Sequence, residues 1–370
     1  MAKKMGLFLT GGGARGAYQA GVLNGISQFL PEDKNPFPIL TGTSAGAINC
    51  SFIASKIEHE NFKQITSDLV YLWENIKSND VLQTNPIKLF GNGSKWLSIL
   101  MGGGLHIGNT RNLSLLNTDN LITFLSKHIS FKNISEAVKN KHLDSIGITT
   151  LCYEDSKTRT FFDTSLDIEP WQRNLREGIR ESINLNHIIS SASIPIIFPS
   201  HKYSTKFYGD GSIRNIAPLS ASIKLGADKI LIINVKAKRS PMIIDEKGPS
   251  LSQVLGTLLH GLMLDNLDSD IERVEGINNL LNGQEDPAGH RQVKTLLISP
   301  SENIGKIASQ EYQNLPKTIQ FLFKGLGDPK ESSDLISYLL FEKSFTSRLI
   351  RLGYQDALNN KEKILNFLKD

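Results

Sequence analysis

The chain has 370 residues, of which 39% are hydrophobic and 21% charged, a composition that supplies a folded core and excludes a largely disordered protein. Its net charge is +4 and it has no long basic run, which argues against a nucleic-acid-binding protein. Its two cysteines, Cys50 and Cys152, offer neither a disulfide framework nor a cysteine-based metal site, so a reducing compartment is expected.

Neither of two apolar stretches has the pattern of a membrane signal. Residues 5–10 are too short for the core of a signal peptide. Residues 35–55 carry no charge, but their prolines, glycines and polar side chains indicate a buried strand, turn and helix rather than a membrane span. We therefore expect a cytoplasmic protein that meets a membrane only at its surface; export by signal-independent machinery stays open.

A glycine loop stands near the start of the chain. Residues 7–10 predict a short buried strand, and Gly11-Gly12-Gly13-Ala14-Arg15-Gly16 then leads into a helix. Backbone N–H groups at such a helix start bind an anion, either a phosphate or a developing oxyanion. The loop also satisfies G-x-G-x-x-G, so a dinucleotide site stays open, although Glu32 and Asp33 follow a helix end and not a strand.

The second motif is a serine on a predicted sharp turn. Residues 37–41 predict a strand, and the helix that follows runs to about residue 56. Between them lies Gly42-Thr43-Ser44-Ala45-Gly46, which has the G-x-S-x-G pattern of a nucleophile elbow. The small neighbours permit a strained turn, and the helix start favours alkoxide character at Ser44. A simple serine-containing turn is the alternative interpretation.

Residues 78–111 differ from the amphipathic helix predicted just before them, at residues 62–76. They are rich in glycine and asparagine, and they carry an apolar cluster that includes Trp96 and Leu100, with lysines nearby. Two interpretations stay open for this cluster. It forms a lid or membrane-docking loop that contacts lipid, or it packs against the core.

The remaining pattern alternates strands and helices. It predicts an α/β fold with a largely parallel or mixed central sheet, covered by helices on both faces. Strands are expected at residues 146–153, 158–162, 206–208, 230–235 and 293–298. Helices are expected at residues 118–128, 174–188, 217–225 and 251–281, and from 303 onward with breaks near Pro316, residues 325–329 and Gly353.

A serine nucleophile needs a base. Of the eight histidines, none lies at a strand end with glycine neighbours, so each is interpreted as an ordinary packed or surface residue. Asp210 is better placed, within Tyr208-Gly209-Asp210-Gly211-Ser212 at the end of a short strand. A partly desolvated carboxylate within hydrogen-bond reach can take the serine proton directly. Taken alone, the segment is also a common Asp-Gly turn.

Four motifs now stand in order, and together they resemble the patatin-like phospholipase family. They are the glycine loop at 11–16, the serine turn at 42–46, a small-residue stretch with Pro195 and Phe198-Pro199 at 191–199, and Asp-Gly-Ser at 210–212. The resemblance covers residues 5–236. Ser212 departs from the family's usual glycine or alanine, which leaves the geometry of the Asp210 turn open.

The resemblance implies a three-layer α/β/α fold and a serine hydrolase of lipid acyl esters. Ser44 would be the nucleophile and Asp210 its base, with no metal or organic cofactor. The N–H groups of Gly11, Gly12 and Gly13 would form the oxyanion hole, and Arg15 would hold that loop. The expected partners are a lipid substrate and a peripheral membrane surface, contacted through Trp96 and Leu100.

The expected organisation is a catalytic domain at residues 1–236 and a mainly helical C-terminal extension at residues 237–370. Three alternatives to a Ser–Asp hydrolase stay open. They are a histidine-dependent esterase of the α/β-hydrolase type, a phosphate- or dinucleotide-binding protein that uses the glycine loop, and a non-catalytic lipid-binding protein. The lipid class, positional specificity and oligomeric state are left open as well.

Overall fold

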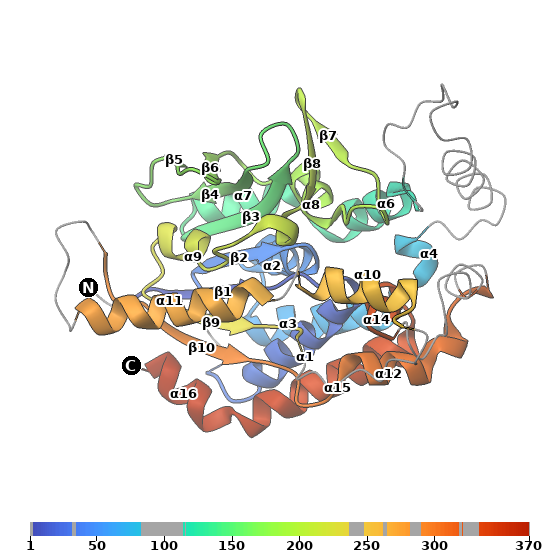
Figure 1. Ribbon diagram of the computed structural model, residues 1–370. Coiled ribbons are helices and arrows are strands. Elements are labelled where there is room, and N and C mark those ends of the chain that lie inside the picture. Colours follow the sequence, from blue (N-terminus) through green and yellow to red (C-terminus); the bar gives the residue numbers. More distant parts are fainter. Residues whose placement is uncertain are drawn as a thin grey trace.

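The computed structural model describes residues 3–31, 35–82, 114, 116–236, 248–261, 265–281, 290–317, 320 and 333–369. Its described strands form a ten-stranded mixed sheet in the order β10-β9-β1-β2-β3-β4-β6-β5, and β8 joins β3 to β7 (Figure 1). The strands are β1 (Met5–Leu9), β2 (Ile39–Thr43), β3 (Ser145–Cys152), β4 (Thr158–Thr164), β5 (Trp171–Gln172), β6 (Arg176–Arg180), β7 (His201–Tyr203), β8 (Lys206–Asp210), β9 (Lys229–Ile233) and β10 (Lys294–Ile298). The five strands β10, β9, β1, β2 and β3 are parallel neighbours.

Helices surround this sheet, and the predicted α/β fold is confirmed. The helices before β8 are α1 (Gly16–Ser27), α2 (Ala45–Lys56), α3 (Phe62–Asn75), α4 (Ser78–Val81), α6 (Asp119–His128), α7 (Phe131–Lys139) and α8 (Leu185–Ala192). The later helices are α9 (Ser220–Lys224), α10 (Leu251–His260), α11 (Asn266–Leu281), α12 (Ile304–Glu311), α14 (Ser333–Leu339), α15 (Lys343–Asn359) and α16 (Lys361–Lys369). Short 3₁₀ turns are η1 (Gly13–Arg15), η3 (Gly211–Arg214) and η5 (Tyr312–Asn314).

Both faces of the central strands are buried, which explains their continuous apolar sequences. On β1, Leu7 and Leu9 join one apolar cluster and Phe8 joins the other, as strand alternation requires. The first cluster includes α1, α2, α3 and α15, and the second includes α9 and α11. The sheet is therefore the middle layer of three.

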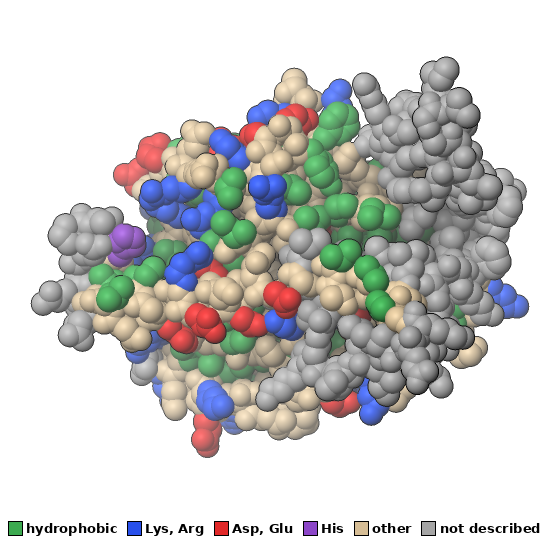
Figure 2. Space-filling model, viewed as in Figure 1, with side chains coloured by type: hydrophobic (Ala, Val, Ile, Leu, Met, Phe, Trp, Pro, Cys, Tyr) green, Lys and Arg blue, Asp and Glu red, His purple; other side chains and the backbone are tan. Residues whose placement is uncertain are grey.

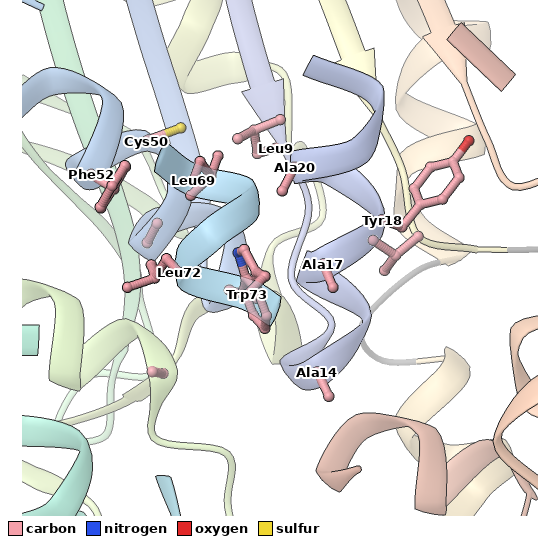
Figure 3. Close-up of a cluster of buried hydrophobic side chains, with 14 of the residues drawn as sticks. Leu9, Ala14, Ala17, Tyr18, Ala20, Cys50, Phe52, Leu69, Leu72 and Trp73 are labelled. Atoms are coloured by element: carbon pink, nitrogen blue, oxygen red, sulfur yellow. The ribbon is translucent and has the colours of Figure 1, made fainter. Parts of the chain in front are cut away.

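Three helices on the first face hold the strand ends that carry the motifs. Buried side chains of α1, α2 and α3 pack together, and Figure 3 shows Trp73 between α3 and the part of α1 that carries Ala17. Trp73 lies so close to α1 that a Cβ at Gly16 would come within 2.8 Å of its ring. The Trp73 Nε1–H donates to Asn49 Oδ1 at 2.8 Å, and Asn49 Nδ2 donates to the Gly16 carbonyl at 3.1 Å. This packing fixes the start of α1, directly after the glycine loop.

The helix predicted at residues 174–188 is wrong in its first half. Residues 176–180 form β6, which pairs in parallel with β4, and α8 begins only at Leu185. Leu175, Ile179 and Ile183 are four residues apart, which satisfies a helical pattern. Pairing with β4 overrides that local pattern, because the backbone groups of residues 176–180 are hydrogen-bonded to β4 within the sheet.

The predicted helix break at Gly353 is also wrong, because α15 continues through this residue. The glycine serves close packing of two helices: a Cβ at Gly353 would lie 2.2 Å from the Tyr18 carbonyl oxygen. On the facing helix, a Cβ at Gly21 would lie 2.1 Å from the Ile350 oxygen. Another difference is that α7 was not predicted, whereas α10 and α11 both lie within the helical range predicted at residues 251–281.

Residues after 236 pack against the part of the chain that carries the motifs. They add β10 to the edge of the sheet beside β9, and α15 packs against α1. The expected domain boundary at residue 236 stays a prediction.

Candidate active site

Three of the predicted motifs lie at one edge of the sheet. β1 and β2 are parallel neighbours, so the glycine loop and the serine turn leave the sheet side by side. β3 lies parallel to β2, and its residue Thr150 is paired with Asp210 at the end of the antiparallel strand β8. The strand order therefore brings Ser44 and Asp210 together.

Ser44 occupies a strained turn between β2 and α2. Its backbone has φ 54° and ψ −123°, in the region that favours glycine. The flanking glycines are required by close approach: a Cβ at Gly42 would lie 2.4 Å from the Gly46 oxygen, and one at Gly46 would lie 2.1 Å from the Leu9 oxygen. This is the geometry of a nucleophile elbow, which exposes a serine hydroxyl at the top of a sheet.

The small-residue motif after α8 supports both chemical groups. The Ser44 N–H donates to Ser191 Oγ at 2.8 Å, and the Ser191 hydroxyl donates in turn to the Thr149 carbonyl at 2.7 Å. The Asp210 N–H donates to the Ser193 carbonyl at 2.9 Å. The motif thus ties the serine turn and the aspartate turn to one segment, and the hydroxyl contacts give a physical reason for a serine at 191.

Asp210 is fully buried, with 0% of its surface exposed. Burial raises the pKa of this carboxyl to about 6, while hydrogen bonding from the Ser44 hydroxyl and from Ser212 favours its charged form. The Ser212 N–H donates to Oδ1 at 2.8 Å. Oδ2 is buried and has no hydrogen-bond partner of standard geometry among the described residues, so it can accept a proton. An open carboxylate acceptor beside a hydroxyl is what a general base requires.

The raised pKa of Asp210 predicts that the charged carboxylate lowers the free energy of unfolding at neutral pH. Its folded value of about 6 lies above the unfolded value of 3.8, so stability from this group is present below pH 4 and is lost as pH rises through 6. One pKa unit corresponds to about 1.4 kcal/mol, so the shift from 3.8 to about 6 lowers the free energy of unfolding by about 3 kcal/mol. We expect Asp210→Asn to gain stability relative to wild type between pH 4 and pH 8, measured by urea unfolding. A difference between the two proteins that does not change with pH would contradict this cost.

The glycine loop is held close to the chain around it. Gly13 has φ 55°, and a Cβ there would lie 2.2 Å from the Tyr338 carbonyl oxygen. Gly12 has φ 166° and ψ 9°, outside the left-handed region, and a Cβ there would meet Val235 Cγ2 at 2.5 Å. Glycine is therefore required at 13 by conformation and contact, and at 12 by contact alone.

The donors of this loop are available to a ligand. Among the described residues, the N–H groups of Gly11 and Gly12 donate no hydrogen bond to the protein. Gly13 shares a pocket wall with Ser44, whereas Gly11 lines a small separate hollow together with Ser212. Of the three predicted donors, Gly13 thus lies on the pocket that Ser44 faces.

Arg15 connects the loop to the C-terminal part of the chain. Only 1% of its surface is exposed, and its Nε donates to Ser337 Oγ at 2.7 Å. Nη2 donates to Asp334 Oδ1 at 3.1 Å, and the guanidinium lies 4.2 Å above the Tyr338 ring centre. Helix α14 is therefore fastened to the glycine loop at the same place where the Tyr338 carbonyl abuts Gly13.

Ser44 lines an apolar pocket with a free volume of about 30 Å³. Its walls come from α2, α3, α6, the small-residue motif and the chain at α14. The lining residues are Gly13, Ser44, Ala45, Ile48, Leu72, Trp73, Ile76, Val81, Leu121, Phe124, Leu125, Ala192, Ile194, Phe198, Tyr338, Leu339 and Phe341. Apolar walls of this kind are typical of sites for apolar ligands. The sequence pattern identified apolar faces on the helices but gave no signal that they meet at the serine.

The described histidines give no support to a histidine base. No histidine lines the pocket of Ser44. His187 is buried against the Phe161 ring, 4.1 Å between centres, and burial lowers its pKa to about 3. His290 lines a different pocket. Neither residue contacts Ser44 among the described hydrogen bonds.

Several predicted features lie outside the described residues. They include Trp96 and Leu100 of the apolar loop, and Glu32 and Asp33 of the dinucleotide alternative. Within the part of the chain that the structure covers, no helix combines the length and apolar character that a bilayer crossing needs. In that same part, no three His, Cys, Asp or Glu side chains are grouped to hold a metal ion.

Comparison with known proteins agrees with the motifs. The family model for patatin-like phospholipases matches residues 7–223. The probable lipid hydrolase 463L of Invertebrate iridescent virus 6 is 28% identical over 228 residues, which are 59% of this chain and 63% of the relative. The chain thus spans less than two thirds of that relative's length.

Among solved structures, VipD from Legionella pneumophila has a TM-score of 0.38 and 12% sequence identity to this chain. The alignment covers 100% of this chain and 67% of the VipD chain. The family match at residues 7–223 is the stronger finding, since it covers more than half of the chain and contains all four motifs. The resemblance predicted from those motifs is confirmed. The chain belongs to the patatin-like phospholipase family.

Proposed function

We propose that the protein is a serine lipid acyl hydrolase that uses Ser44 as nucleophile and Asp210 as base. The observation that carries the proposal is the serine itself: it stands on a strained turn, beside a buried carboxylate, and faces an apolar pocket. Family membership and the name of the viral relative support a lipid substrate. A phosphate- or dinucleotide-binding role leaves this arrangement of serine, carboxylate and pocket unexplained.

The first step forms an acyl-enzyme. Asp210 accepts the proton of the Ser44 hydroxyl while Oγ attacks the ester carbonyl carbon. Negative charge collects on the carbonyl oxygen, where N–H groups of the glycine loop stabilise it. The carbonyl then reforms, the bond to the alcohol oxygen breaks, and Asp210 returns the proton to the leaving alcohol or lysolipid.

The second step releases the fatty acid. Water enters where the alcohol left, Asp210 accepts one of its protons, and the oxygen attacks the acyl carbon. The ester bond to Ser44 Oγ breaks, and the proton held by Asp210 returns to the serine. The acid is freed and both residues regain their starting state, so no cofactor is consumed.

The pocket and the loop suggest how a lipid is held. The apolar walls beside Ser44 would take the fatty acyl chain, with the ester carbonyl between Ser44 Oγ and Gly13. Arg15 would act as a positioning residue, because it fastens the loop to α14. We propose phospholipids and lysophospholipids as substrates. Contact with a membrane surface through Trp96 and Leu100 stays a prediction.

The proposal is tested by fatty-acid release from a panel of lipids. Phosphatidylcholine, lysophosphatidylcholine, a triacylglycerol and a soluble short-chain ester would be offered to wild type and to Ser44→Ala. We expect release from at least one lipid by wild type only. A lipid that binds but is never cleaved would identify a non-catalytic lipid-binding protein. Equal activity in both proteins would exclude Ser44 as nucleophile.

The pKa of Asp210 predicts the pH dependence of the reaction. Because its raised pKa is about 6, the carboxylate is mostly charged at pH 7 and able to accept a proton. We expect kcat/KM on a soluble ester to fall about tenfold per pH unit well below pH 6, since only the charged form is a base. A profile that stays level down to pH 4 would contradict Asp210 as the base.

A further inference from the structure

A second pocket lies away from Ser44, and cationic side chains dominate its wall. Its volume is about 560 Å³, within the range of small-molecule sites. The lining residues are Arg173, Arg176, Ser220, Ile223, Lys224, Asp270, Arg273, Val274, Ile277, Asn278, His290, Arg291 and Val293. Figure 2 shows Lys and Arg side chains gathered between the places where Figure 1 labels β6 and α9, with Asp and Glu side chains along α11. We call this hollow the cationic pocket.

The cationic pocket is separate from the pocket of Ser44, because the two share no lining residue. Residues 290–293 directly precede β10, and Ile223 and Lys224 form the end of α9. Arg176 begins β6 and pairs with Thr158 of β4. The cationic pocket is therefore not part of the site at Ser44.

Two of its cations are already engaged by the protein. Arg291 donates from Nε to Asp228 Oδ1 at 2.9 Å and from Nη2 to the Ile223 carbonyl at 2.8 Å. Arg273 is paired with Asp270, whose other oxygen accepts the Leu219 N–H at 2.8 Å. Both carboxylates are thereby used, and these contacts build the wall of the pocket.

Three cations have no such partner. Within the described residues, Arg173, Arg176 and Lys224 make no side-chain hydrogen bond or ion pair with a carboxylate. They also repel one another: the pKa values of Arg176 and Lys224 are lowered, first by burial and then by neighbouring arginines, although Asp270 partly offsets this for Arg176. Five Lys and Arg side chains thus line the pocket beside one lining carboxylate, Asp270, and a bound anion relieves this excess of like charge.

The rest of the wall suits a phosphate-bearing ligand. Ser220 and Asn278 add neutral polar side chains, and Val274 and Val293 form buried apolar floor. An apolar floor lowers the local dielectric constant and strengthens attraction between charges. Guanidinium groups match the geometry of phosphate oxygens by paired hydrogen bonds.

We propose that the cationic pocket binds a ligand carrying two or more phosphate charges, held by Arg173, Arg176 and Lys224. The phosphate comes either from a soluble small molecule or from the headgroup of an anionic lipid. The site is independent of the hydrolytic reaction at Ser44, so its ligand is an effector or an anchor and not the ester that is cleaved.

The test measures binding of two probes to the full chain. Sodium tripolyphosphate is titrated by calorimetry at low salt, and vesicles of phosphatidylcholine with phosphatidic acid are assayed by flotation. The pocket variant is Arg176→Gln with Lys224→Gln. The control variant is Lys139→Gln with Lys363→Gln, which removes the same charge from exposed positions outside the pocket.

We expect the pocket variant to weaken binding more than about tenfold and the control variant less than about twofold. Added salt should weaken binding as well. Binding of tripolyphosphate identifies a soluble ligand, and variant-sensitive binding of phosphatidic acid vesicles alone identifies a lipid headgroup. Hydrolysis of a soluble ester should be unchanged in both variants, which shows that they are folded. No binding of either probe, or equal weakening by both variants, would overturn the proposal.

Discussion

Replacing Ser44 with alanine is expected to lower kcat for ester hydrolysis by about 10⁶-fold, and Asp210→Asn by about 10⁴-fold or more. In the proposed mechanism the two residues act as a unit, because the hydroxyl attacks only while the carboxylate takes its proton. The double variant should therefore be little slower than Ser44→Ala alone. The measurement is initial-rate kinetics on a soluble short-chain ester, which avoids any effect of lipid aggregation.

A measurement of stability by urea unfolding supplies the control for this experiment. Asp210→Asn is expected to be at least as stable as wild type above pH 6, so its loss of activity does not arise from unfolding. Substantial esterase activity in folded Asp210→Asn would exclude the dyad. A pH profile that then followed a histidine would restore the histidine-dependent alternative.

The second large effect on kcat is expected from a substitution in the glycine loop. Gly12→Ala is expected to lower kcat by about 10²- to 10³-fold if it displaces a donor of the oxyanion hole. The cause is steric, because the new Cβ would lie 2.5 Å from Val235 Cγ2. The φ of Gly12, 166°, lies outside the left-handed region, so the clash comes from the contact, and shortening Val235 to alanine should make room and restore part of the rate. KM should change much less than kcat.

Gly13→Ala provides the matched comparison. Here the new Cβ would meet the Tyr338 backbone at 2.2 Å, and the backbone has φ 55°, so Val235→Ala should not rescue this variant. Rescue of Gly12→Ala alone would show that donor position, and not loop folding in general, controls the rate. A rise in KM with unchanged kcat would instead indicate a phosphate or nucleotide site. Titration with a nicotinamide dinucleotide would then decide the ligand.

The sequence by itself determined the family and the motifs that build the candidate site. The serine turn is a local requirement for glycine, because a Cβ at Gly42 would lie 2.4 Å from the oxygen of Gly46 in the same turn. The apolar runs of β1, β2 and β9 show strands buried on both faces, and the parallel order places their ends at one edge. Such features are readable because their cause lies within a few residues.

The tertiary structure decided what depends on contacts between distant segments. Pairing with β4 made β6 a strand where local spacing predicted a helix, and packing on α1 made Gly353 part of a continuous helix. The support of Ser44 by Ser191, the raised pKa of Asp210, and the part of α14 in the pocket all arise between residues far apart in the chain. Burial and close approach are properties of the folded chain, so no pattern of neighbouring residues encodes them.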